Sequence, residues 1–153
     1  MMTDYNTLNA TLASLIGGVP HRTANLANAS ALLYSSLDRL NWAGFYFIEG
    51  TVLVLDAFQG KPACIEIPLG KGVCGTAAAS DRTVVVPDVH LFPGHIACDS
   101  ASESEIVVPI RKDGKVIGVL DIDSPVKERF SEDDRVGLEA FVSVIEREMG
   151  GIL

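Results

Sequence analysis

The stretch EIVVPIRKDGKVIGVLDID, residues 105–123, determines the fold of this chain of 153 residues. It consists of two apolar runs separated by the pair Asp113-Gly114. Asp-Gly between two such runs is a strong short-range signal for a β-hairpin, because both residues tolerate the positive φ angles of the tight turn. We therefore predict two adjacent antiparallel strands here.

Four further strands are indicated before this hairpin. The segment NWAGFYFIEGTVLVLDAF (41–58) predicts two strands around a turn at Glu49-Gly50. CIEIPL (64–69) alternates like a short strand, and RTVVV (82–86) reads as a buried strand that ends at Pro87. The chain then has five or six strands whose connections favour an antiparallel sheet.

Helical spacing of apolar residues is confined to the two ends of the chain. Near the N-terminus two such sets predict two helices, the first ending at Gly17-Gly18; their members are Leu8, Leu12, Leu15 and Ile16, then Leu26, Leu33 and Leu37. Ser131 and Asp134 resemble a capping box that opens a C-terminal helix. The predicted core face of this helix is Leu138, Phe141, Val142, Ile145 and Met149. We predict an α+β fold in one domain, residues 1–153, with the N- and C-terminal helices packed on one face of the sheet.

Composition excludes several classes of protein. Hydrophobic residues make up 48% of the chain and the formal net charge is −8, so the chain should fold and should bind neither nucleic acid nor an anionic membrane. The N-terminus has no basic start and no apolar run, which predicts no signal peptide. The three cysteines form no close pairs, unlike a secreted disulfide framework, and favour a cytoplasmic setting.

Two cysteines stand in segments that favour chemistry. Cys98 lies in a loop of about 17 residues between Pro87 and Glu103, long enough to suggest function. Cys74 lies in GKGVCGTAAAS (70–80), which reads as a glycine-rich loop entering a short helix. The helix dipole lowers the pKa of a thiol at that position, so physical chemistry alone selects Cys74 as the reactive one.

Two other interpretations of the cysteines remain open. Each cysteine can be a small buried hydrophobic side chain. Alternatively, His90, His95 and Cys98 together with a second cysteine can bind zinc, although the chain has no Cys-x-x-Cys pair.

The hairpin also carries carboxylates. Glu105 starts its first strand, and the spacing of Asp121 and Asp123 places both on one face of the second. Neighbouring acids raise one another's pKa, and the apolar run around them predicts partial burial. A solvated surface edge is the alternative.

Aromatic residues alternate in the first predicted strand. Trp42, Gly44 and Tyr46 fall on one face, and Phe45 and Phe47 on the other. Trp42 and Tyr46 carry polar groups, which favours a pocket over a core.

Three segments together resemble a GAF domain, specifically the stand-alone free methionine-(R)-sulfoxide reductases. They are GKGVCGTAAA (70–79), VPDVHLFPGHIACDSASESEIVVPI (86–110) and GKVIGVLDIDSP (114–125). The resemblance covers most of the chain, from about Leu40 onward. The pattern of Cys64, Cys74 and Cys98 is its specific part, whereas the hairpin is general to GAF domains.

The resemblance assigns a role to each candidate. It implies that Cys98 attacks the sulfoxide of free methionine sulfoxide, that Cys64 resolves the intermediate as a disulfide, and that Cys74 is secondary. It implies that Glu105, Asp121 and Asp123 bind the ammonium group and supply a proton, while Trp42 and Tyr46 surround the methyl-sulfur end. We place the substrate carboxylate at the start of the 70–80 helix.

The resemblance also implies an external reductant. It implies that thioredoxin or another dithiol reduces the disulfide, that no cofactor is bound and that no metal is required. GAF domains often pair through their terminal helices, which makes a homodimer one option and leaves the oligomeric state open. The alternative is a GAF-type sensor that binds a small ligand without catalysis, but no output domain is apparent in this sequence.

Overall fold

The structure is a computed structural model that describes residues 2–153. Its sheet has six strands in the order β3-β2-β1-β6-β5-β4, and every neighbouring pair is antiparallel. The elements in chain order are α1 (Tyr5–Ile16), α2 (Arg22–Ser36), β1 (Trp42–Glu49), β2 (Val52–Gly60), β3 (Glu66–Pro68), α3 (Gly72–Ser80), β4 (Val84–Val86), the 3-10 helix η1 (Val89–Leu91), β5 (Ser104–Lys112), β6 (Lys115–Ser124) and α4 (Glu132–Met149). The predicted antiparallel α+β architecture is confirmed. None of the described helices is long and apolar enough to cross a membrane.

The predicted hairpin is formed by β5 and β6. Lys112 pairs with Lys115, which leaves Asp113 and Gly114 as a two-residue loop. Their φ angles are 53° and 77°, and a type I′ turn needs a positive φ at both positions. The turn sets the register beside the loop, where Arg111 pairs with Val116; an irregularity next to Ile110 then shifts the pairing, so that Ser104 at the far end lies opposite Ser124.

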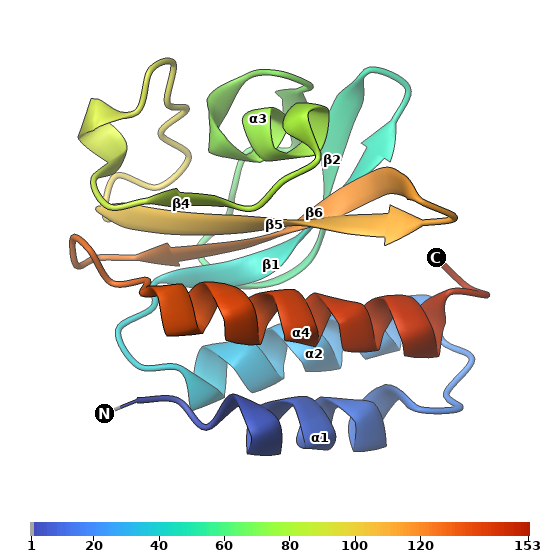
Figure 1. Cartoon of the computed structure of the whole chain (residues 1–153). Helices are drawn as coiled ribbons and strands as arrows, with labels where there is room; N and C mark the ends of the chain where they lie inside the picture. The colour runs from blue at the N-terminus through green and yellow to red at the C-terminus, as the bar shows by residue number, and fades with distance from the viewer. Residues whose placement is uncertain (1) are drawn as a thin grey trace.

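Helices cover the two faces of the sheet unequally. In Figure 1, α1, α2 and α4 lie below the sheet, and α3 lies above it together with the loop that follows β4. We call these two sides the lower face and the upper face. The N- and C-terminal helices therefore share one face as predicted, whereas α3 stands alone on the other.

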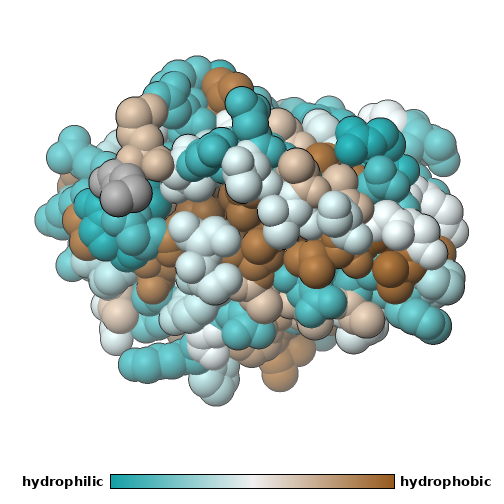
Figure 2. All heavy atoms as spheres, turned by 90° about the horizontal axis from the view of Figure 1, so that it is seen from below, coloured by the Kyte–Doolittle hydropathy of each residue, from teal (hydrophilic) through white to brown (hydrophobic). Residues whose placement is uncertain are grey.

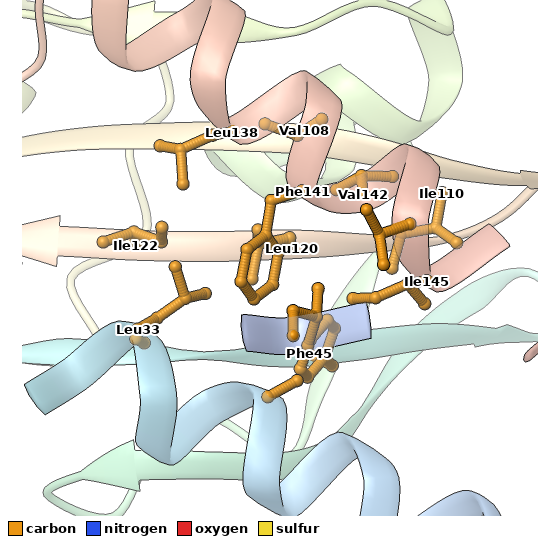
Figure 3. Close-up of a cluster of buried hydrophobic side chains, with 14 of the residues drawn as sticks. Leu33, Phe45, Val108, Ile110, Leu120, Ile122, Leu138, Phe141, Val142 and Ile145 are labelled. Atoms are coloured by element: carbon orange, nitrogen blue, oxygen red, sulfur yellow. The ribbon is translucent and has the colours of Figure 1, made fainter. Parts of the chain in front are cut away.

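The lower face buries an apolar core. Strand residues that point down meet the inward faces of α2 and α4, as Figure 3 shows. The labelled members are Leu33, Phe45, Val108, Ile110, Leu120, Ile122, Leu138, Phe141, Val142 and Ile145. The five residues predicted for the core face of α4 are all buried, and the capping box at Ser131 and Asp134 is formed. One expectation was wrong: Leu15 is 41% exposed, because α1 has only one face against the protein.

The upper face buries a second, smaller cluster. It includes Trp42 and Tyr46 of β1, Val107 of β5, Val119 of β6 and Cys74 of α3. The alternation predicted for β1 is confirmed, since Ala43 and Phe45 belong instead to the lower core. Polar side chains are built into this upper cluster, and they form the candidate site.

Candidate active site on the upper face

Strand register brings three carboxyl groups together on the upper face. Asp121 and Asp123 alternate along β6 with residues that point down into the lower core. Glu105 of β5 lies directly opposite Asp123, and Trp42 of β1 lies opposite Asp123 on the other side. The three predicted acids and the predicted tryptophan thus meet on adjacent central strands.

Burial raises the pKa of all three acids. Glu105 and Asp121 are each 6% exposed and Asp123 is half-buried. Burial is the largest cause of each raised pKa; Glu105 is raised further by both aspartates, and Asp123 further by Asp121. A buried carboxyl of raised pKa can hold a proton near neutral pH. One oxygen of Asp121, Oδ1, has no hydrogen-bond partner among the described residues and is therefore available to a ligand.

The structure joins Cys64 and Cys98 in a disulfide. Their Cα atoms lie 5.4 Å apart, although the residues are 34 positions apart in sequence. Cys98 lies in the loop between β4 and β5, and Cys64 precedes β3. This is the pairing that the sequence resemblance implied.

Cys74 is free and buried, which corrects the helix-dipole expectation. Although it lies in the first turn of α3, it is only 4% exposed and its Sγ lies 4.0 Å from Oε2 of Glu105. Burial raises its pKa, and the neighbouring charges of Asp121 and Glu105 raise it further. These effects oppose the dipole and exceed it, so this thiol stays protonated.

The zinc alternative is also not supported. Sγ of Cys98 is bonded to Cys64, and Nε2 of His90 lies 2.6 Å from Oε2 of Glu103. His95 points elsewhere, with its Nε2 3.9 Å from Oε1 of Glu105. The proposed ligands are therefore not gathered around one point.

Trp42 and Tyr46 make hydrogen bonds to the backbone that the sequence did not reveal. Nε1 of Trp42 donates to the carbonyl of Lys61 at 3.1 Å, and the hydroxyl of Tyr46 donates to the carbonyl of Cys64 at 2.8 Å. Burial raises the pKa of Tyr46, so the phenol keeps the proton that it donates. Both aromatic residues therefore fix the segment that carries Cys64. Backbone carbonyls have no sequence signature, so this contact could not be read from the chain.

Gly44 allows the tryptophan to lie across the strand. A Cβ atom at this position would lie 2.8 Å from Cη2 of Trp42 and 2.3 Å from Cβ of Phe58. Such distances are far below van der Waals contact, so any side chain here would displace Trp42, whose ring stacks on Phe58 with centroids 5.2 Å apart.

One pocket is lined by candidate residues and by further residues that the sequence had not indicated as part of a substrate site. Its lining includes Trp42, Tyr46, Cys74, Cys98, Glu105, Asp121 and Asp123. His95 also lines it, although the sequence had suggested it only as a zinc ligand, and Asp99 and Ser102 line it without belonging to any pattern that identified them in advance. Asn41 donates from its amide to Asp99 and to Ser102, each at 3.0 Å, and so ties the end of the loop to the start of β1. Burial lowers the pKa of His95, which favours its neutral form.

Comparison with known proteins places this site in a family. The GAF domain profile matches residues 19–149. The free methionine-R-sulfoxide reductase of Escherichia coli is 52% identical over 94% of this chain and 87% of its own length. The reduced form of fRMsr from Staphylococcus aureus superimposes with a TM-score of 0.94 at 56% identity, covering 97% of this chain and 96% of that one. The complex of that protein with its substrate superimposes on this chain with a TM-score of 0.93 at 55% identity, and the match covers 97% of both chains. The chain belongs to the GAF domain family and, within it, to the free methionine-R-sulfoxide reductases.

Proposed function

We propose that this protein reduces free methionine (R)-sulfoxide to methionine, with Cys98 as the nucleophile and Cys64 as the resolving cysteine. The observation that carries the proposal is the Cys64–Cys98 disulfide beside a pocket lined by three carboxyl groups, two of them buried and one half-buried. Two thiols supply the two electrons that a sulfoxide needs. The packing of α1 and α4 into one lower core supports residues 1–153 as a single GAF domain.

Each part of a free amino acid has a counterpart in the pocket. Its ammonium group pairs with the carboxylates, of which Asp121 has an oxygen without a partner. Its methyl-sulfur end contacts the rings of Trp42 and Tyr46, which are 5.9 Å apart. Its carboxylate accepts hydrogen bonds from the first turn of α3, where the unpaired N–H groups of a helix favour an anion.

The chemistry proceeds in two steps. The thiolate of Cys98 attacks the sulfoxide sulfur while a protonated carboxyl group protonates the oxygen, so methionine leaves and Cys98 becomes a sulfenic acid. The thiol of Cys64 then attacks Sγ of Cys98, which forms the disulfide and releases water. A carboxyl of raised pKa, Glu105 or Asp123, suits the role of acid.

The cycle is closed by an external dithiol, thioredoxin in the proposed physiological reaction. Its thiolates reduce the Cys64–Cys98 disulfide by exchange. The reaction needs no bound cofactor and no metal ion, because all electrons pass between sulfur atoms.

The proposed assembly is a homodimer through the terminal helices. Figure 2 shows this side of the molecule from below, with hydrophobic side chains in a band among hydrophilic ones. Leu15 of α1 and Val136 of α4 are 41% and 54% exposed. Sedimentation equilibrium of the protein and of Val136→Lys tests this, and a wild-type monomer at all concentrations contradicts it.

One assay tests the function. The protein is incubated with racemic methionine sulfoxide and dithiothreitol, and we expect methionine to form until half of the sulfoxide is consumed. N-acetyl-methionine sulfoxide is the matched control, because it lacks the ammonium group that the acids bind, and we expect slow turnover. A protein that binds the compound without producing methionine is a sensor, and equal turnover of the acetylated compound contradicts the carboxylate site.

A further inference from the structure

We infer that the protein dithiol docks on the exposed segment around Cys64 and attacks Sγ of Cys64, so that Cys98 is the thiol set free in the pocket. This inference rests on the proposed function and adds to it the docking surface and the sulfur atom that receives the attack.

The two cysteines differ in what surrounds them. Cys98 lines the pocket and Cys64 does not. The residues on both sides of Cys64 include exposed ones, namely Lys61, Pro62, Ile65 and Glu66. A thiolate attacks a disulfide along the sulfur–sulfur axis, from behind the sulfur with which it bonds. Exposed residues also flank Cys98, namely Ile96, Ala97 and Ser100. We infer attack on Cys64 because it lies outside the pocket, so the partner need not enter the space that the substrate occupies.

Apolar side chains lie near both cysteines in sequence. Ile65 follows Cys64 directly and is 69% exposed, and Ile96, two residues before Cys98, is 37% exposed. Ile65 therefore forms an apolar border beside Cys64 outside the pocket, whereas Ile96 lines the pocket near Gly72. Exposed large aliphatic side chains beside a reactive group are typical of an interaction surface. A protein dithiol gains affinity from this border that a small thiol such as dithiothreitol cannot gain.

The Cys64 segment is also held in place by two side chains of β1. The carbonyls of Lys61 and Cys64 accept the hydrogen bonds of Trp42 and Tyr46 described above. Before Cys98, the φ angle of Gly94 is 73°, and a side chain at that position would contact nothing within 4 Å. A fixed segment suits docking, because it loses little freedom when the partner binds.

The exchange balances without any other reactant. The partner's thiolate bonds to Sγ of Cys64, the Cys64–Cys98 bond breaks, and its electron pair stays on Cys98, which takes up a proton. The partner's second thiol then attacks the mixed disulfide. Cys64 leaves as a thiolate, and the partner departs with its two cysteines oxidised to a disulfide.

The substitution Ile65→Asp tests the docking surface. With thioredoxin as reductant we expect kcat/KM for thioredoxin to fall about tenfold or more, which corresponds to about 1.4 kcal/mol of binding. Turnover driven by dithiothreitol should stay at the wild-type level, because the small thiol does not need the apolar border. Val126→Asp, a matched change of an exposed apolar residue in the loop after β6, should leave both rates unchanged.

The outcomes separate this inference from the proposed function. If the wild-type protein forms no methionine with dithiothreitol, the proposed function fails. If it does so and Ile65→Asp keeps its full rate with thioredoxin, only the docking surface fails. An equal loss with both reductants also overturns the docking surface, because it places Ile65 in the chemistry or in folding.

A trapping experiment identifies the sulfur. A thioredoxin whose second active-site cysteine is replaced by serine stops at the mixed disulfide. Peptide mass spectrometry of the trapped complex should find the partner on Cys64. A partner found on Cys98 overturns the assignment.

Discussion

The upper and lower faces of the sheet are formed by the same strands, but they bury opposite kinds of side chain. In β6, Leu120 and Ile122 point down into an apolar core, and Asp121 and Asp123 point up into the pocket. The two buried acids, the half-buried Asp123 and the buried thiol lower stability, because burial favours their uncharged forms and leaves Asp121 with an unpartnered oxygen. The lower core, which involves α1, α2 and α4, offsets this cost. The difference teaches that the two-residue period of a strand can separate stability from chemistry within one segment.

The largest effect on the chemistry of the upper face is expected from removing its nucleophile. Cys98→Ser should abolish methionine formation, because the remaining thiols either lie outside the pocket or stay protonated. Cys64→Ser should still release about one methionine per protein without reductant, since the first step needs one thiol only. Quench-flow measurement of methionine per enzyme checks both. A burst from Cys98→Ser would identify a different nucleophile.

A substitution in the lower core should change the stability of the protein but not its activity. Phe141→Ala removes a fully buried ring from the lower core and should lower the free energy of unfolding by about 3–5 kcal/mol. Urea denaturation measures the loss. The activity per folded molecule, measured at low temperature, should stay close to wild type. A fall in this specific activity would show that the two faces are coupled.

Removing one acid of the upper face should lower activity without lowering stability. Glu105→Gln keeps the shape of the side chain and removes its proton, so we expect kcat to fall about a hundredfold or more if it is the general acid. Because the uncharged amide is easier to bury, the free energy of unfolding should not fall. A loss confined to KM marks a binding role instead, and Asp123→Asn provides the matched comparison.

Stability should also depend on pH through the upper face. The pKa of Glu105 is raised in the folded state above its ordinary value of 4.5. At a pH between the pKa of Glu105 in the unfolded chain and its pKa in the folded protein, the folded state therefore binds more protons than the unfolded chain. Stability therefore falls as pH rises through this window. Denaturation midpoints at successive pH values should show this slope in wild type and a smaller slope in Glu105→Gln. Equal slopes would mean that Glu105 titrates normally.

The smallest effect is expected at the buried thiol. Cys74→Ser changes a side chain that lies outside the disulfide, so most thioredoxin-driven turnover should remain. The steady-state rate with thioredoxin measures this. An inactive Cys74→Ser that is fully folded by circular dichroism would restore the helix-dipole interpretation.

Features that depend on neighbours in sequence could be predicted. The Asp113-Gly114 turn, the capping box at Ser131 and the alternation around Trp42 are set by local backbone geometry, and the structure agrees with each. These predictions required no knowledge of how the layers pack.

Features that depend on packing could not be predicted. The pKa of Cys74 is raised first by burial and then by carboxyl groups of two strands beneath α3, which a local argument about the helix N-terminus cannot include. The exposure of Leu15 reflects which side of α1 meets the protein. The carbonyls of Lys61 and Cys64 lie near the aromatic residues because β1 pairs with β2 in the folded protein, which brings segments distant in sequence together.

Trp42 is the single tryptophan of the chain, and it lines the same pocket as Cys98. Indole emission responds to the polarity of its surroundings and is quenched by nearby disulfide bonds. The protein therefore contains an optical probe at the place where its redox state changes. Fluorescence excited at the indole should follow substrate binding, disulfide formation and re-reduction in real time, without an added label.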